Sequence, residues 1–295
     1  MFPTIAISLF GILAAIAWGT ADLFAAKASR RLSPEAVALW VSLIGVIAFA
    51  GIYLVFPGNL SWTHTGFLYA VAAGVSLELG LFMLFRGLDA GPVSIVSPIS
   101  SAYPLVSLLI LLGVFGGTLP SIEIVGIIVT VIGIVIASGL GDIRKSETKL
   151  TVGIGYGIAA FLLWGLAYAM LGKSVNLIGW QKSALIDTCA GFIALMVVLA
   201  LISLKDPNQK LGRLFKSKAY TDKYVLGTAL VQLSGGIIFT IGLAHAQSGS
   251  VITAISATYP ALTILLAVKH FGEKKKLVPL TGAFITILGV VILSF

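Results

Sequence analysis

The stretch SSAYPLVSLLI, residues 100–110, recurs as SATYPALTILL, residues 256–266, and this repetition decides the fold. Each copy carries a serine three positions before a Tyr-Pro pair, and glycines follow at the same spacing in both copies. The positions that match under a shift of 156 are Ser100 with Ser256, Tyr103-Pro104 with Tyr259-Pro260, Gly126 with Gly282, and Gly133 with Gly289. A repeat of this length indicates two copies of one structural unit.

The first part of each copy repeats as well, at a shift of 146. Trp18-Gly19 with Lys27 recurs as Trp164-Gly165 with Lys173. The repeats predict one half at residues 1–140, a linker loop at 141–150 and a second half at 151–295.

Composition places these halves in a membrane. Apolar residues make up 58% of the 295 residues, charged residues make up 10%, and the mean hydropathy is +1.08. These values exclude a water-soluble globular protein. Ten apolar runs are long enough to cross a bilayer. They cover residues 4–25, 34–56, 66–86, 92–115, 121–140, 151–172, 180–203, 223–245, 249–271 and 277–294.

Five helices per half is an odd number, so the second half must start on the opposite side of the bilayer from the first. We therefore expect an all-α membrane protein of ten transmembrane helices in two inverted five-helix repeats, an architecture common among secondary transporters.

Charge gives an orientation. Of the 19 Lys and Arg residues, only Lys173 and Lys182 lie outside the loops that follow odd-numbered spans. Cytoplasmic loops collect basic residues. The odd loops are therefore expected in the cytoplasm and both termini outside the cell membrane. The net charge of +8 reflects this orientation and not binding to nucleic acid.

The paired Trp-Gly and Tyr-Pro motifs, the stretch Phe271-Gly272-Glu273 after the ninth span and the Gly-rich last span resemble the EamA-type branch of the drug/metabolite transporter (DMT) superfamily. The resemblance covers nearly the whole chain, although Gly117 stands where the first half would carry the counterpart of Glu273. It implies a central cavity lined mainly by the first, third, fourth, sixth, eighth and ninth helices, and secondary transport of small metabolites, often export.

Glu78 lies midway through the third span, where an ionised carboxylate costs about 3 kcal/mol or more unless it faces protein or water. Its helix face also carries Gly74, which indicates a packed face. We interpret Glu78 as a proton-accepting or cation-binding group; the alternative is a structural carboxyl reached by Arg86. The shift of 156 gives Ser234 as its counterpart, and Gln232 lies beside that position, so both are expected in the cavity wall.

Trp18 and Asp22 share a helix face, and Trp164 and Tyr168 occupy the equivalent positions in the second half. Aromatic faces beside a carboxylate suit amphipathic or cationic ligands. The alternatives are interfacial anchoring or packing for the tryptophans, and for Asp22 hydration or pairing with Lys27.

Pro104 and Pro260 lie inside membrane spans, where a proline removes one helical hydrogen bond and kinks the helix. Matching kinks in the two halves indicate the binding site or the bending elements of alternating access, so Tyr103 and Tyr259 are expected to line the pathway. Pro98 predicts a second break in the fourth span only.

Other classes of protein find less support. Gly139-Leu140-Gly141-Asp142 and Pro260-Ala261-Leu262 look like motifs of intramembrane aspartyl proteases, but the Tyr-Asp pair that such enzymes need is absent from the sequence. Asp187 is interpreted as structural, with Lys182 within reach as a partner. No His, Cys or carboxylate cluster has metal-ligand spacing. We therefore expect no enzyme activity, metal or cofactor, whereas a lipid flippase or scramblase remains an alternative.

Together these features predict a transporter that moves a small organic metabolite by alternating access, either coupled to protons or as a facilitator, in the export direction. Amino acids, amines and similar amphipathic or cationic solutes fit the expected cavity. Its partners are the solute, membrane lipid and protons, and the chain is expected to act as a monomer or a homodimer.

Overall fold

The computed structural model describes residues 4–58, 61–137, 148–205, 211–217, 219–246, 249–271 and 277–293, and within these ranges it contains helices and no strand. The helices of the first half are α1 (Thr4–Arg31), α2 (Pro34–Val55), α3 (His64–Ala90), α4 (Val93–Ser101), α5 (Pro104–Gly113) and α6 (Ser121–Ala137). Those of the second half are α7 (Thr148–Ile178), α8 (Trp180–Lys205), α9 (Leu211–Lys216), α10 (Lys223–His245), α11 (Gly249–Ser256), α12 (Pro260–Phe271) and α13 (Leu277–Leu293). A short 3₁₀ helix, Ala219–Thr221, precedes α10.

Eight helical segments in the described ranges are long and apolar enough to cross a membrane. Helices α6 and α13 are also apolar but have only 17 residues each. The prediction of an all-α membrane protein is confirmed, and the count of ten spans stays a prediction. Asp142 and Glu273 lie outside the described residues. Residues 141–147 of the predicted linker lie outside them as well, whereas residues 148–150 belong to α7.

Both Tyr-Pro motifs interrupt a helix, as predicted. Turns interrupt the regular helix between α4 and α5 at Ala102 and Tyr103, and between α11 and α12 at residues 257–259. The break predicted at Pro98 is wrong, because α4 continues through that residue. Pro98 removes one hydrogen bond from the middle of a short helix, and the turns on either side of it remain helical.

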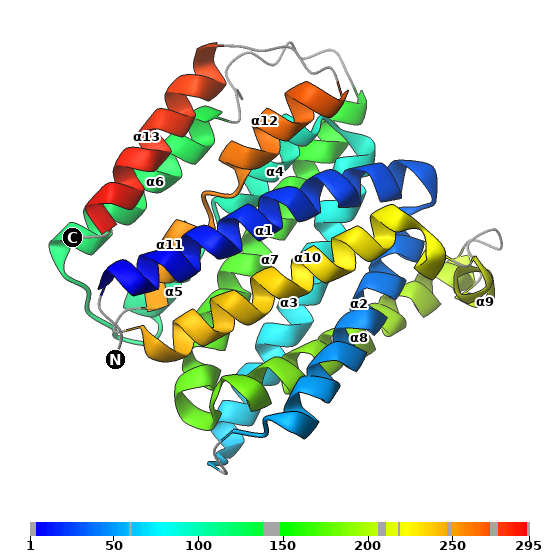
Figure 1. Ribbon diagram of the computed structural model, residues 1–295, viewed down its shortest axis with the longest axis horizontal. Coiled ribbons are helices and arrows are strands. Elements are labelled where there is room, and N and C mark those ends of the chain that lie inside the picture. The colour runs from blue at the N-terminus through cyan, green and yellow to red at the C-terminus, as the bar shows by residue number, and fades with distance from the viewer. Residues whose placement is uncertain are drawn as a thin grey trace.

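Helices from the two halves pack against each other around the centre of the molecule. Helix α1 lies beside α10, and α3 lies beside α7, so the first long helix of each half contacts the third long helix of the other. Helices α6 and α13 pair at one edge of the bundle, while α2 and α8 pack together on the opposite side (Figure 1).

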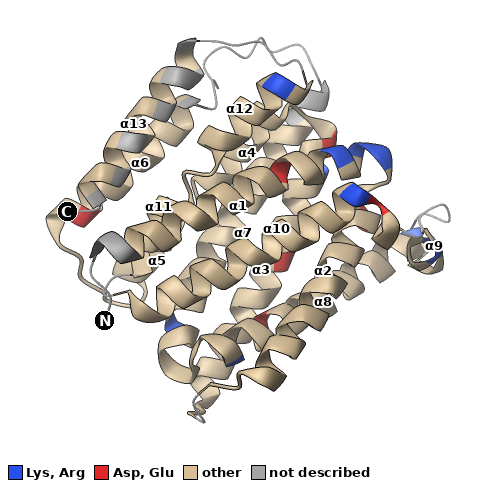
Figure 2. Ribbon diagram, in the orientation of Figure 1, with Lys and Arg blue, Asp and Glu red and all other residues tan. Residues whose placement is uncertain are grey.

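Basic side chains gather at one end of the bundle. Figure 2 shows Lys and Arg at the C-terminal ends of α1 and α12, at the start of α10 and on α9. Lys173 and Lys182 lie at the other end, where Lys182 donates a 2.5 Å hydrogen bond to the carbonyl of Ser61 in the α2–α3 connection. We call the first region the basic end.

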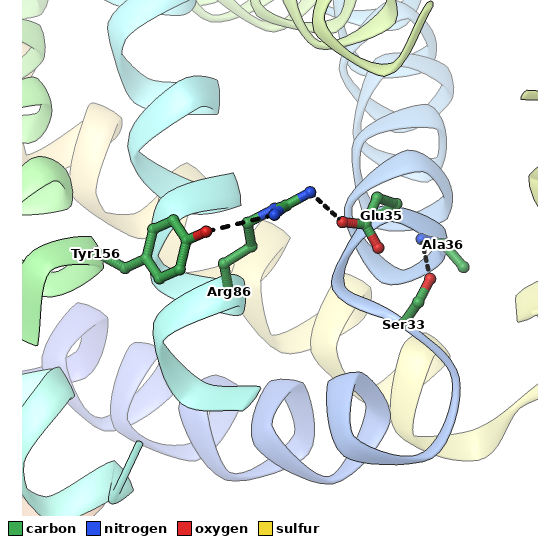
Figure 3. Close-up of polar contacts among 5 residues, drawn as sticks. All are labelled: Ser33, Glu35, Ala36, Arg86 and Tyr156. Atoms are coloured by element: carbon green, nitrogen blue, oxygen red, sulfur yellow. Dashed lines mark hydrogen bonds and ion pairs between the residues drawn. The ribbon is translucent and has the colours of Figure 1, made fainter. Parts of the chain in front are cut away.

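An ion pair and an adjoining hydrogen bond, both made by Arg86, link three helices near the basic end. Arg86 at the end of α3 contacts Glu35 in the first turn of α2 at 2.5 Å, and its other terminal nitrogen donates to the hydroxyl of Tyr156 on α7 at 3.3 Å (Figure 3). Ser33 caps α2 just before this pair by accepting from the backbone N–H of Ala36. Glu35 is buried, so its charge depends on Arg86.

The contact between α6 and α13 depends on glycine in both halves. A side chain at Gly133 would collide with the backbone of Thr286, and one at Gly289 would collide with the backbone of Thr130. The two contacts are related by the 156-residue shift. Small residues let helices approach closely in lipid, where apolar burial does not drive association.

Replacing Gly133 by alanine is expected to destabilise the protein, because overpacking of this kind costs about 1–3 kcal/mol. The matched control is Gly155→Ala on the exposed side of α7, where a Cβ meets no neighbour within 4 Å. Thermal unfolding of detergent-purified protein measures both. A melting temperature of Gly133→Ala at or above that of the control would contradict the packing argument.

Removing the Glu35 charge should leave Arg86 without its partner. Loss of one member of a buried pair costs about 3 kcal/mol, whereas an apolar replacement of both members is often neutral. Glu35→Gln is therefore expected to lower the melting temperature, and the double variant Glu35→Leu with Arg86→Met to recover most of the loss. Equal losses in the single and double variants would show that the pair does not stabilise the fold.

Candidate functional site

A cavity of about 160 Å³ lies between the two halves. Its walls come from α1, α2, α3, α7, α8 and α10 and from the tyrosines at the two helix breaks. The helices α2 and α8 are an addition to the walls that the family resemblance implied. Eight of the nine residues predicted for the cavity line it: Trp18, Asp22, Glu78, Tyr103, Trp164, Tyr168, Gln232 and Tyr259.

The ninth prediction, Ser234, is wrong, because this residue is exposed and does not line the cavity. The error comes from the register. Gly80 on α3 lies against Trp164, and Gly235 on α10 lies against Trp18, so these helices match at a shift of 155 and not 156. One residue turns a helix by about 100°. The counterpart of Glu78 is therefore Leu233, which does line the cavity.

Aromatic rings from both halves form one side of the cavity. The ring of Trp18 lies 6.1 Å from Tyr168 and 6.4 Å from Tyr259, between ring centroids. Tyr103 stacks on Tyr168 at 4.5 Å, and Phe239 packs against Trp18 at 5.5 Å. The aromatic residues predicted separately in each half thus form a single cluster.

The two helix breaks are joined by reciprocal hydrogen bonds. The hydroxyl of Tyr103 lies 3.3 Å from that of Ser256, and the hydroxyl of Tyr259 lies 3.2 Å from that of Ser100. All four residues are buried. The serine and tyrosine of each repeated motif therefore bond to the tyrosine and serine of the other.

Asp22 is a buried carboxyl group held by two hydroxyls. Ser97 on α4 donates to its Oδ2, and the hydroxyl of Thr263 on α12 lies 3.3 Å from the same oxygen and equally far from the carbonyls of Gly19 and Tyr259. Within the described residues Oδ1 accepts no hydrogen bond. Asp22 thus faces the cavity with one oxygen available.

Glu78 and Asp187 lie together where α3 crosses α8. A side chain at Gly74 would collide with the backbone of Asp187, and one at Gly191 would meet Cβ of Glu78 at 2.8 Å. Both residues line the cavity at this crossing. Ser42 on α2 donates to Oε1 of Glu78.

The second oxygen of Glu78, Oε2, accepts no hydrogen bond from the part of the chain that the structure describes. Asp187 accepts a 3.0 Å hydrogen bond from the hydroxyl of Thr188 on its own helix. Each of these two groups is therefore held by one hydroxyl.

The cationic partners considered for these acids have other contacts. Arg86 pairs with Glu35 and not with Glu78. Lys182 bonds to a backbone carbonyl, and the ammonium group of Lys27 lies 5.4 Å from the ring centre of Tyr224. None of the described residues that line the cavity is Lys, Arg or His. Three carboxyl groups therefore share a cavity without a basic side chain.

The two equivalent tryptophans differ in their hydrogen bonds. Nε1 of Trp164 donates to the carbonyl of Leu77 on α3 at 3.1 Å. Nε1 of Trp18 is buried and finds no acceptor among the residues whose positions are described. The contact between α3 and α7 therefore includes a hydrogen bond from its tryptophan, whereas the equivalent contact between α1 and α10 does not.

A second pocket, of about 420 Å³, lies at the end opposite to the basic end, between α5, α6, α7 and α11. We call it the outer pocket. Its lining includes Glu123, Lys173 and Asn176, and it shares Tyr168 with the central cavity. Tyr168, whose ring stacks on Tyr103, is therefore a residue of both linings.

Sequence reasoning missed Asp187 and Ser42 as cavity residues. Asp187 was interpreted as structural because nothing in its own span marked it. The available signal was its spacing: Ala184 and Gly191 lie three and four positions away, on the same face of α8. Ser42 had no signal beyond its shift of 146 from Thr188, which also lines the cavity.

Comparison with known proteins finds relatives along most of the chain. An uncharacterized transporter of Archaeoglobus fulgidus is 25% identical over 289 residues, covering 97% of this chain and 96% of its own. An uncharacterized protein of Methanocaldococcus jannaschii is 27% identical over 130 residues, covering 44% of this chain and 94% of its own. A solved crystal structure with 16% identity covers 97% of both chains with a TM-score of 0.68, which shows a shared fold.

The model of the EamA-like transporter family matches the chain twice, at residues 5–139 and at residues 151–295. These two matches cover nearly all of the sequence, and the helical fold with its membrane-length segments agrees with them. The chain is a multi-pass membrane protein that belongs to the EamA-like transporter family.

Proposed function

We propose that this protein is a secondary transporter that moves a small organic solute by alternating access, in exchange for protons taken up at Glu78. The observation that carries the proposal is the cavity itself. It lies between the two segments that match the family, and its walls hold three carboxyl groups and no basic side chain among the described residues.

The arrangement of Glu78 supports a role in coupling. A carboxyl group at this depth is stable when it is protonated or when it faces a cation. Glu78 lies beside Asp187, so a negative charge on both groups at once is unfavourable without a proton or a cation nearby. Protonation of Glu78 relieves this repulsion, and a positive charge bound elsewhere in the same cavity does so as well, so solute binding and proton uptake are coupled through the charge of the cavity.

Alternating access requires a barrier on one side of the cavity. Tyr168 lines both the cavity and the outer pocket, which makes it the candidate barrier, and the helix breaks beside Tyr103 and Tyr259 provide points at which helices can bend. Movement of these segments would join the two spaces. With an inward proton gradient, exchange of solute for protons moves the solute outward, so the proposed direction is export.

The orientation follows from the charges. The basic end holds the Lys and Arg residues of α1, α9, α10 and α12, which we place on the cytoplasmic side of the cell membrane. The outer pocket and both termini then lie on the extracytoplasmic side.

Glu78→Gln is expected to abolish solute-driven proton movement, because glutamine fills the same space and cannot titrate. Proteoliposomes that contain a pH-sensitive dye are challenged with amino acids, quaternary amines, polyamines, aromatic compounds and sugar derivatives. The wild type should release or take up protons with at least one of these classes. Asp89→Asn, which changes an exposed acid outside the cavity, serves as the control and should behave like the wild type.

Full coupling in Glu78→Gln would remove Glu78 from the mechanism. Redistribution of a fluorescent lipid reporter in the same liposomes, with no solute added and no solute transported, would instead identify a lipid scramblase. Both variants are first compared with the wild type by gel filtration, so that a misfolded protein is not read as an inactive one.

The proposed orientation predicts which surface residues a membrane-impermeant maleimide can label in intact cells. In a Cys189→Ser background, a cysteine replacing Trp62, an exposed residue between α2 and α3, should be labelled. A cysteine replacing Lys216 on α9 should react only after permeabilisation. The reverse pattern would place both termini in the cytoplasm.

A further inference from the structure

We propose that the cavity is built for a small monovalent organic cation, a quaternary or protonated amine, with Asp22 as its counter-ion and the rings of Trp18, Tyr168 and Tyr259 as its walls. This inference rests on the proposed function and names the class of solute. It assigns different roles to the acids: Asp22 binds the solute, while Glu78 and Asp187 accept protons.

The charge of the cavity gives the first argument. Asp22, Glu78 and Asp187 all line it, and each is held by hydroxyl groups and not by a cation. The described basic residues nearest to these acids along the chain are Lys27, Arg86 and Lys182, and all three have partners elsewhere. An anionic solute would add a further negative charge to this space, and a neutral solute would leave the acids without a counter-charge.

The position of Asp22 gives the second argument. It lies one helical turn from Trp18, and both residues line the cavity together with Tyr259. Ser97 and Thr263 hold its Oδ2, which fixes the carboxyl group and leaves Oδ1 for a ligand. Burial disfavours a charge on this carboxyl group, and the hydroxyl donors together with a bound cation would offset that cost.

The aromatic walls distinguish an organic cation from an inorganic one. The rings of Tyr168 and Tyr259 lie 6.1 Å and 6.4 Å from Trp18, and rings grouped in this way attract alkylammonium groups through their faces. Metal ions prefer three or more oxygen, nitrogen or sulfur ligands. The described residues contain no group of three or more His, Cys, Asp or Glu that could hold a metal ion.

Size sets a further limit. An apolar cavity of about 150 Å³ holds one benzene molecule. The cavity of about 160 Å³ therefore suits a compact solute of similar bulk in this conformation. Choline and tetramethylammonium meet this limit and serve as probes.

The test uses three molecules of nearly the same shape with different charge: choline, the neutral 3,3-dimethyl-1-butanol and the anionic 3,3-dimethylbutanoate. Thermal shift and isothermal titration on the detergent-purified wild type report binding. We expect choline to raise the melting temperature and to bind at least tenfold more tightly than the neutral molecule, and the anion to give no shift. Equal binding of the neutral molecule or binding of the anion would overturn the proposal.

Two variants assign the contacts. Asp22→Asn is expected to weaken choline binding at least tenfold, and Asp89→Asn, outside the cavity, to leave it unchanged. Trp18→Leu should weaken choline binding and leave binding of the neutral molecule as it is. Unchanged choline affinity in Asp22→Asn would contradict the proposal. If a variant fails to fold, the three-molecule comparison on the wild type still decides.

Inorganic cations provide the remaining comparison. Sodium or magnesium chloride at the ionic strength of the choline samples should give no comparable shift, and a shift equal to that of choline would indicate an inorganic cation site.

Failure of this inference can be distinguished from failure of the proposed function. Solute-driven proton movement without a preference for choline rejects only the inference, whereas choline binding without any transport rejects only the proposed function.

Discussion

Close contact between helix backbones at glycine residues holds this bundle around its cavity. In lipid, burial of apolar surface does not drive helices to associate. Van der Waals contact between closely spaced helices contributes instead. At the crossing of α3 and α8, Gly74 and Gly191 let the backbones meet; Glu78 lies one turn after Gly74, and Asp187 lies one turn before Gly191. Because the backbones of α3 and α8 lie close together here, the two acids lie close together as well. The stability of the bundle and the chemistry of the cavity therefore depend on the same contacts.

Much of the architecture could be predicted from the sequence, because its causes are local. A run of about twenty apolar residues is sufficient to define a membrane helix. Pro104 and Pro260 each lack the N–H that would continue the preceding helix, and a new helix starts at each of them. The repeat then relates the halves, so that residues far apart in sequence, such as Trp18 and Trp164, were assigned to one cavity, where the structure places them.

The rest depended on contacts between distant segments. Arg86 lies two turns from Glu78 along α3, yet it bonds to Glu35 on α2, and no local pattern indicates this choice. The error at Ser234 has a different cause. Loops of unequal length change the shift from 146 to 155 and then to 156 along the chain, and one residue of error moves a side chain to another face of its helix. Asp187 was missed because the residues that it packs against, among them Gly74, lie on another helix.

The three acids of the cavity have no acidic counterparts: Asp22 matches Tyr168, Glu78 matches Leu233, and Asp187 matches Val41. A homodimer of the first half alone would bring two copies each of Asp22 and Glu78 into one small space. Four carboxyl groups there would repel one another more strongly than a single small cation could offset. Joining two halves in one chain removes this restriction, because each wall can then change its residues independently. A single chain that contains both halves can carry an odd number of acidic groups in its cavity. A symmetric pair of identical chains always carries an even number.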